Sequence, residues 1–154
     1  MPLGNATDND HKFMALALEE AKTGYDEGGV PVGAVMVEDD EVIGRGRNRR
    51  VQEGNPVSHG ETDCMKNTGR RSDYSRVTMY TTLSPCMMCT GTILQFAIPR
   101  VVVGEDRNFA GNIEFLVERG VEVALLQDPD CIALMGRFIR EHPEIWNEDI
   151  AEDG

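Results

Sequence analysis

Apolar residues recur along this chain with two different periods, and the changes of period predict its elements. Near the N-terminus, Phe13, Ala17 and Ala21 share one helical stripe that Met14 and Leu18 flank, which indicates an amphipathic helix. Short runs rich in apolar and β-branched residues are instead typical of strands. These patterns predict helices over 8–25, 59–69, 86–96, 112–119 and 128–142, and strands over 32–37, 41–47, 77–83, 100–103 and 121–126.

The order of these elements predicts the fold class. The first two strands form a hairpin, and helices and strands alternate after it. Because such alternation is typical of α/β domains, we expect a three-layer α/β/α sandwich around a five-stranded mixed sheet. Residues 48–58 contain Gly54, Asn55 and Pro56 and are expected to form a loop, and Pro143 is expected to end the last helix.

The stretch from 144 to 154 has two interpretations. Its acidic composition is typical of a solvated tail. It also contains Ile145, Trp146 and Ile150, and large apolar side chains are usually buried. We therefore expect part of this stretch to pack against the rest of the chain.

Length and composition limit the class of protein. The chain has 154 residues, 40% of them hydrophobic, which suffices for one domain with a full core. It has no apolar run of about 18 residues, so no membrane span is expected. Residues 1–10 lack the basic start and apolar centre of a secretory signal, and a reducing, cytoplasmic location is the expectation. There Cys64 and Cys131 are expected to pack as small hydrophobic residues.

The net charge of −12 indicates what kind of partner to expect. Proteins that bind nucleic acids usually need a basic surface that replaces the counterions of the phosphates. Arg45, Arg47, Arg49 and Arg50 form one local basic stretch, but the overall field repels polyanions. We expect a small, uncharged substrate, with no nucleic-acid and no membrane partner.

Two short motifs carry the candidate chemistry. His59 and Glu61 form H-x-E, while Cys86 and Cys89 form C-x-x-C directly after Pro85. Positions i and i+3 of one helical turn face the same way, so both sulfurs can reach one ion. The imidazole completes a set of three ligands that selects zinc and, in catalytic sites, leaves the fourth position to water. Glu61 is expected beside that position, where it can move protons between water and substrate.

Each motif alone has a simpler interpretation. A lone C-x-x-C is compatible with a redox pair or with half of a structural zinc site. A four-cysteine site would need a second closely spaced pair, whereas Cys64 and Cys131 are isolated. A redox pair usually accompanies a thioredoxin-like pattern, whereas this motif follows the third predicted strand. The combination with H-x-E favours a catalytic zinc, while His11 and His142 have no such neighbours and are expected on the surface.

At these motifs the chain resembles the cytidine-deaminase-like zinc hydrolases, and within them the fungal-type cytosine deaminases that act on the free base. The resemblance includes the segments 27–33, 44–48, 59–61, 80–86, 89–91, 98–100, 102–105, 108–109 and 146–150. It implies one deaminase domain over residues 1–154, with 144–154 as a C-terminal segment that closes the pocket. It also implies one catalytic Zn²⁺ in each chain, a homodimer and a role in pyrimidine salvage.

The resemblance also implies roles for individual residues. The same three side chains would bind zinc, and Glu61 would be the proton shuttle. Asn48 and the backbone N–H of Gly60 would hold the carbonyl side of a pyrimidine ring, while Asp149 and the backbone carbonyl of Ser84 would accept from its exocyclic amine. Four apolar side chains would line or close the pocket, those of Val32, Leu83, Phe109 and Trp146.

Elementary chemistry suits these roles, although ordinary structural roles stay open. A planar polar base needs apolar walls and a few directed polar groups, and an amide offers both a donor and an acceptor. On the other hand, Asn48 follows a predicted strand and could be a turn residue. Phe109, Val32 and Leu83 could simply belong to the core.

The chain departs from the fungal type at three places. Met87 and Met88 stand where Asp-Met is expected, the segment 110–112 is short, and Val32 replaces isoleucine. These changes are expected to touch the pocket wall and the loop over it.

The expected reaction converts cytosine and water into uracil and ammonia. Alternatives are deamination of guanine, of a modified pyrimidine or of a tRNA adenosine. A non-catalytic zinc module that binds a partner is the alternative of another class, but a purely structural site has no need of Glu61.

Overall fold

Five strands form one mixed sheet in the computed structural model, which describes residues 3–152. Their order in the sheet is β2 (Glu41–Arg47), β1 (Gly33–Glu38), β3 (Val77–Thr81), β4 (Arg100–Val103) and β5 (Glu122–Leu125). β1 is antiparallel to both of its neighbours, whereas β3, β4 and β5 run parallel. The predicted five-stranded mixed sheet is therefore confirmed.

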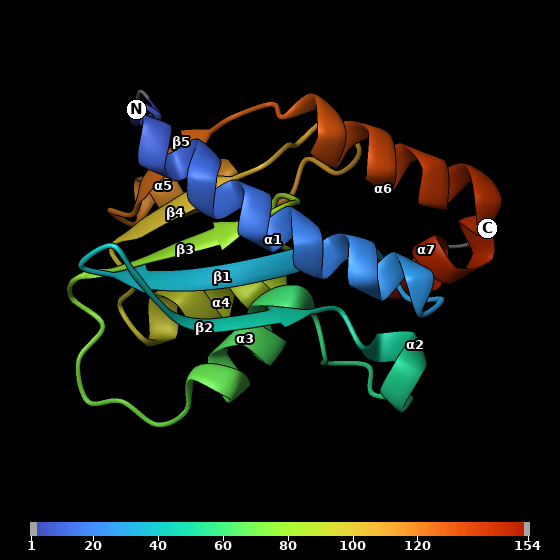
Figure 1. Cartoon of the computed structure of the whole chain (residues 1–154), viewed down its shortest axis with the longest axis horizontal. Coiled ribbons are helices and arrows are strands. Elements are labelled where there is room, and N and C mark those ends of the chain that lie inside the picture. Colours follow the sequence, from blue (N-terminus) through green and yellow to red (C-terminus); the bar gives the residue numbers. More distant parts are fainter. Residues whose placement is uncertain (1–2, 153–154) are drawn as a thin grey trace.

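Helices cover both faces of this sheet (Figure 1). They are α1 (Asp8–Asp26), α2 (Arg50–Glu53), α3 (Gly60–Thr68), α4 (Met87–Gln95), α5 (Ile113–Glu118), α6 (Pro129–Glu141) and α7 (Pro143–Asp149). Adjacent strand residues point to opposite faces. Val35 and Tyr80 accordingly pack with α1 and α6, while Met36 and Met79 pack with α3, α4 and α5. The predicted three-layer α/β/α sandwich is confirmed.

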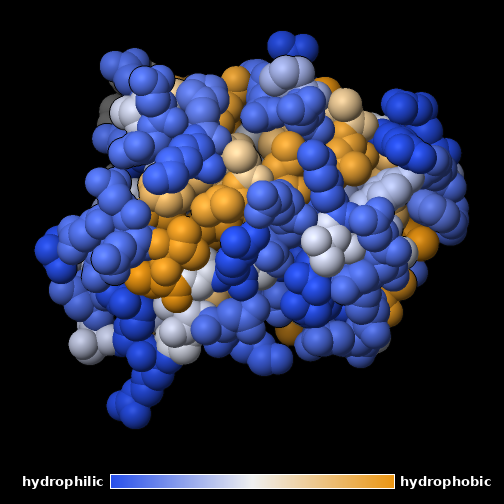
Figure 2. All heavy atoms as spheres, viewed as in Figure 1, coloured by the Kyte–Doolittle hydropathy of each residue, from blue (hydrophilic) through white to orange (hydrophobic). Residues whose placement is uncertain are grey.

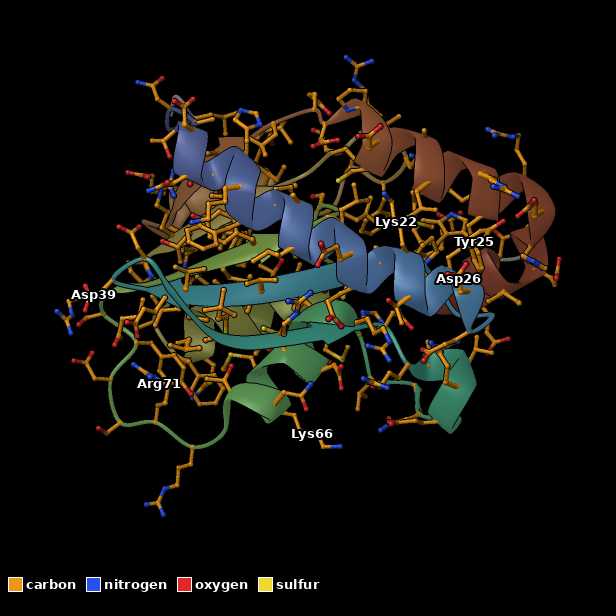
Figure 3. The ribbon with its side chains drawn as sticks, in the orientation of Figure 1. Lys22, Tyr25, Asp26, Asp39, Lys66 and Arg71 are labelled. Atoms are coloured by element: carbon orange, nitrogen blue, oxygen red, sulfur yellow. The ribbon has the colours of Figure 1, made fainter. Side chains whose placement is uncertain are left out.

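The C-terminal half of α6 is attached to the end of α1. Figure 3 shows Tyr25 on the side of α1 that faces α6. Its hydroxyl donates to the Glu141 carboxylate, and its ring meets Phe138 edge-on with a centroid separation of 6.4 Å. Because α7 follows directly after α6, these contacts also determine where α7 starts.

Three segments differ from the sequence prediction. The expected loop 48–58 contains the short helix α2. Pro143 does end α6 as predicted, but it also begins α7, because proline suits a first helical position where the missing N–H has no partner. β3 ends at Thr81, two residues earlier than predicted, and residues 82–84 turn away from the sheet.

The outer surface is mostly polar. Figure 2 shows hydrophobic atoms as a diagonal band in the middle of the face that carries α1 and α6, with hydrophilic residues on both sides. Cys64 and Cys131 are buried and free, as predicted for small core residues. Within residues 3–152, no helix has the length and hydrophobicity that a bilayer span would require.

The crossing of α3 over β2 depends on Gly46. A Cβ atom at this position would lie 2.4 Å from the backbone nitrogen of Cys64 and 2.7 Å from the carbonyl carbon of Asp63. Both are backbone atoms of α3, so neither can move aside cheaply. Glycine thus allows the helix that follows His59 to lie directly on the strand that precedes Asn48.

We predict that Gly46→Ala lowers the free energy of unfolding by about 2 kcal/mol or more, because overpacking forces the helix away from the strand. Urea denaturation followed by circular dichroism would measure the change. Gly91→Ala on α4 is the matched control, since a Cβ there meets no atom within 4 Å. Equal stability of the two variants would contradict the close crossing.

Candidate active site

Two helix N-termini converge at the predicted metal motifs. His59 is the N-cap of α3, Cys86 is the N-cap of α4, and Cys89 lies in the first turn of α4. The Cys86 sulfur accepts a hydrogen bond from the backbone N–H of Cys89 at 3.5 Å. The N-terminal end of a helix favours negative charge, so this position stabilises a thiolate.

The three side chains form a cluster that fits a zinc ion. The Nδ1 atom of His59 lies 3.5 Å from the Cys86 sulfur and 3.7 Å from the Cys89 sulfur. All three ligand atoms lie within 4.8 Å of one another. Tetrahedral zinc, with Zn–S of about 2.3 Å and Zn–N of about 2.0 Å, separates sulfur from nitrogen by roughly 3.5 Å. The observed separations match this geometry, and the soft donor set excludes magnesium and calcium.

The charges around the cluster favour a cation. A hydrogen bond from the thiol of Cys89, with the contact to His59, outweighs burial and lowers the pKa of Cys86 to about 4. That same hydrogen bond, together with burial, raises the pKa of Cys89 well above its ordinary value. Burial would lower the pKa of His59, but its partners Asp149 and Cys86 outweigh it and raise the pKa to about 10. A divalent ion supplies the positive charge that this environment stabilises.

Asp149 orients the imidazole. The Nε2 atom of His59 donates to Oδ1 of Asp149 at 3.0 Å. When a metal ion replaces the second ring proton, the lone pair therefore lies on Nδ1, which faces the two sulfurs. Metal-binding histidines commonly donate their other N–H to a carboxylate in this way. The second oxygen of Asp149 accepts from Nδ2 of Asn48 at 3.0 Å. The carboxylate therefore joins the metal cluster to the amide predicted to hold substrate.

Glu61 is buried beside the cluster, in the first turn of α3. Burial, followed by the negative charge of Cys86, raises the pKa of Glu61 to about 7. A cation held by the cluster would lower this pKa by direct attraction. A carboxyl group that titrates near neutral pH is suited to both accepting and donating a proton.

A pocket opens next to these groups and leaves about 330 Å³ unfilled by protein atoms. Ten of the predicted site residues line it: Val32, Asn48, His59, Glu61, Leu83, Ser84, Cys86, Phe109, Trp146 and Asp149. Cys89 lies buried behind the wall, and Gly60 packs against Val32, where a Cβ would approach the Val32 carbonyl oxygen to 3.0 Å. Ile150 also lines the pocket, although only its apolar character in the tail pointed to it.

Ser84 is fixed from two sides. Its backbone N–H donates to the carbonyl of Glu105 at 2.9 Å, and its hydroxyl donates to the carbonyl of Ala110 at 2.9 Å. Gly111 makes this approach possible, because its φ is +62° and a Cβ would lie 2.1 Å from the Ser84 Oγ. Both donors of Ser84 are used, so it can offer a ligand only acceptors, its backbone carbonyl among them.

Residues 7–105 match the family described as "Cytidine and deoxycytidylate deaminase zinc-binding region". The matched segment contains both metal motifs, with His59, Cys86 and Cys89. The chain belongs to this deaminase family. It is therefore a zinc-binding enzyme that hydrolyses C–N bonds, as the sequence indicated.

Several known proteins resemble this deaminase. Cytosine deaminase of Candida albicans is 49% identical, over 95% of the chain and 99% of that protein. A tRNA-specific adenosine deaminase of Streptococcus pyogenes serotype M1 is 31% identical, over 86% of the chain and 84% of that protein. A solved structure from studies of tRNA:A34 deaminases has a TM-score of 0.68 and 27% identity, over 80% of the chain and 99% of that structure's chain. The fold and the predicted family are confirmed.

The three departures from the fungal type affect the deaminase pocket unequally. Val32 lines the pocket, as predicted. Met87 and Met88 do not line it, and Met87 is 59% exposed, because it begins α4 on the side away from the buried Cys89. The segment 110–112 lies behind Ser84 and is also absent from the lining. Only the change at Val32 touches the wall.

The buried carboxylate of Glu105 stabilises the turn that carries Phe109, one of the two aromatic residues in the wall of the deaminase pocket. Phe109 meets Trp146 edge-on with a centroid separation of 5.8 Å. The preceding residue, Asn108, donates to Glu105 through its backbone N–H at 2.9 Å and through its side chain at 2.8 Å. The side chain also donates to the carbonyl of Ile132 in α6 at 3.0 Å. Glu105 thus fixes the turn that presents Phe109 to α7.

Proposed function

We propose that the chain hydrolyses free cytosine to uracil and ammonia. The observation that carries this proposal is one small pocket that Glu61, the metal cluster and the Asn48–Asp149 pair all face. Apolar side chains form the rest of its wall, as a planar base requires. The 49% identity to the cytosine deaminase of Candida albicans supports the same substrate.

His59, Cys86 and Cys89 would hold the zinc ion. When bound, zinc acts as a Lewis acid that lowers the pKa of water towards about 7. Glu61 would accept a proton from the attacking water and deliver it to the ring nitrogen beside the amine. The same carboxyl would then take the second proton, from the hydroxyl added to the ring carbon, and pass it to the amine. The C–N bond breaks, ammonia leaves and the ring carbonyl of uracil forms. The burial of Glu61 keeps bulk water from competing for these protons.

The polar groups of the pocket suit the edges of cytosine. Nδ2 of Asn48 has two hydrogens, of which one goes to Asp149, so the second can donate to the ring carbonyl. Each oxygen of Asp149 keeps a lone pair beyond its present bond, and the Ser84 carbonyl is a further acceptor. Two acceptors suit an exocyclic amine and would disfavour the carbonyl of uracil at the same place.

Other functions have weaker support. A tRNA substrate would need uncompensated basic residues, but each arginine from 45 to 50 is paired with a carboxylate, as shown by Arg45–Glu20 and Arg49–Asp63 at 2.9 and 3.0 Å. The tRNA-specific relative is also less similar, at 31% identity. A non-catalytic zinc module would have no use for Glu61 facing a pocket.

The first test is ammonia release from a panel of free bases and nucleosides. We expect rapid release from cytosine and little from cytidine, guanine or adenosine, because the closed pocket holds a single ring. Activity on cytidine without activity on cytosine would contradict the proposal.

Glu61→Gln tests the mechanism in the same assay. The amide keeps the shape of the side chain but cannot relay protons, so kcat should fall by a factor of about 100 or more. Zinc content, measured by elemental analysis, should be unchanged because Glu61 is not a proposed ligand. Full activity of this variant would contradict the proton shuttle.

We also propose that residues 1–154 form one deaminase domain in which 144–154 closes the pocket; residues 153 and 154 lie outside the described part. Trp146, Asp149 and Ile150 line the pocket from this segment, and Arg50 of α2 donates to Glu148 of α7 at 2.8 Å. Figure 1 shows α2 and α7 at the same end of the molecule. Closure would exclude water during the reaction.

We predict that Trp146→Ala raises KM for cytosine about 10-fold, which corresponds to a loss of roughly 1.4 kcal/mol of binding free energy. Steady-state kinetics would measure it, with Phe115→Ala on α5 as the aromatic control outside this pocket. Unchanged KM and kcat in Trp146→Ala would remove the closing role of α7.

We propose a homodimer whose interface includes the exposed start of α4. Met87 and Phe96, at the two ends of this helix, are 59% and 45% exposed and would be covered by such an interface. We predict by light scattering a mass about twice the 17.1 kDa of one chain. Met87→Lys should shift the protein towards monomer, and a monomeric wild type would contradict the interface.

A cytoplasmic location and a role in pyrimidine salvage complete the proposal. Zinc binding requires both thiols of the C-x-x-C motif to stay reduced, and a reducing compartment maintains that state. All four cysteines are free in the structure. Conversion of a free base to uracil would return that base to nucleotide synthesis.

A further inference from the structure

Asn48 is held at every polar group it has. Its backbone N–H donates to the Val32 carbonyl at 2.9 Å, and its own carbonyl accepts from the Gln52 side chain at 3.1 Å. Its side-chain oxygen accepts from the backbone N–H of Arg50 at 3.0 Å, and Nδ2 donates to Asp149 at 3.0 Å. The second Nδ2 hydrogen therefore points in a direction that its neighbours determine.

Both sequence neighbours of Asn48 bind one buried carboxylate of α3. Oδ2 of Asp63 accepts from the backbone N–H of Arg47 at 3.0 Å and from Nε of Arg49 at 3.0 Å. The Asp63 side chain is only 3% exposed. It lies one helical turn after His59 and two residues after Glu61.

We propose that Asp63 is a positioning residue that holds Asn48 at the correct distance from Glu61 and the metal ligands. This inference rests on the proposed function, because it assumes that Asn48 binds the base. The side-chain amide of Asn48 would then be positioned by α3, the same helix that carries Glu61. Asp63 itself lies outside the pocket lining.

The other contacts of this segment lead to different elements. Arg47 also donates to Glu20 and Glu27 of α1 and its C-cap, both at 2.9 Å, while Asn48 and Arg50 bind α7. These contacts hold the segment on the sheet and under α7, and they reach α3 only indirectly, through Asp149 and His59, so none of them sets its distance from α3 directly. Asp63 does so on both sides of Asn48.

A second contact between α3 and β2 makes it possible to distinguish the positioning of Asn48 from the general packing of α3 on β2. Nδ2 of Asn67, one turn after Asp63, donates to the carbonyl of Arg45 at 2.9 Å. This bond also ties α3 to β2, but it binds three residues away from Asn48. Asn67→Ala removes this bond and the weaker 3.5 Å contact of the same Nδ2 with Oδ2 of Asp63, but it keeps both bonds from Asp63 to the neighbours of Asn48. It is therefore the matched control.

The test compares Asp63→Ala, Asp63→Asn and Asn67→Ala as zinc-loaded full chains. We expect Asp63→Ala to raise KM for the accepted base about 10-fold while kcat changes less than about 3-fold, because a displaced Asn48 would lose binding that substrate and transition state share. Zinc content should stay at the wild-type level. Asp63→Asn keeps an oxygen that can accept both bonds and should bring KM back to within about 3-fold of wild type, and Asn67→Ala should leave it unchanged.

An unchanged KM in folded Asp63→Ala would overturn the inference. A lower zinc content together with a lower kcat in Asp63→Ala would also overturn it, because Asp63 would then only stabilise α3 and not position Asn48. If Asp63→Ala does not fold, Arg49→Met removes the Nε donor from the other side and should raise KM about 3-fold; no rise would overturn the inference. Inactivity of the wild type on every base would contradict the proposed function instead, and it is seen before any variant is compared.

Discussion

The hydrogen bond between His59 and Asp149 is the interaction on which the site depends. It fixes the imidazole so that Nδ1 faces both sulfurs, and it brings α7 over the pocket. Because the same carboxylate binds Asn48, the metal cluster, the Asn48 amide and α7 share one group. A change in any one of them is felt by the other two. By thermodynamic reciprocity, a base that orders Asp149 would tighten metal binding as much as metal tightens base binding.

The residues of the site lie at the ends of helices and strands and not in their middles. His59 and Cys86 are N-caps, Asn48 follows β2, and Ser84 follows β3. Helix N-termini favour the negative charges of thiolate and carboxylate, so the backbone itself lowers the cost of gathering them. The closely packed sheet behind them, with residues such as Met79 and Val101 fully buried, keeps these ends in place.

The sequence was sufficient for the parts of this structure that depend on local pattern or on narrow chemistry. Apolar periodicity located every strand, and the small set of zinc-binding side chains made His59, Cys86 and Cys89 recognisable. It was not sufficient for the parts whose structure depends on contacts between residues far apart in the sequence. The helix α7 was not predicted: the pattern indicated only a partly packed tail, and the resemblance a pocket-closing segment, because its burial depends on Phe109 and on the wall formed by Val32 and Leu83. Asp63 carried no signal, since its partners Arg47 and Arg49 become neighbours only when α3 lies on β2.

The single tryptophan of the chain lies in the wall of the pocket. Trp146 packs against Phe109 from a different part of the chain, and no other indole contributes to the ultraviolet emission of the protein. Its intrinsic fluorescence is therefore a site-specific optical signal, free of background from other tryptophans. Movement of the C-terminal helix can be followed in real time without attaching a dye.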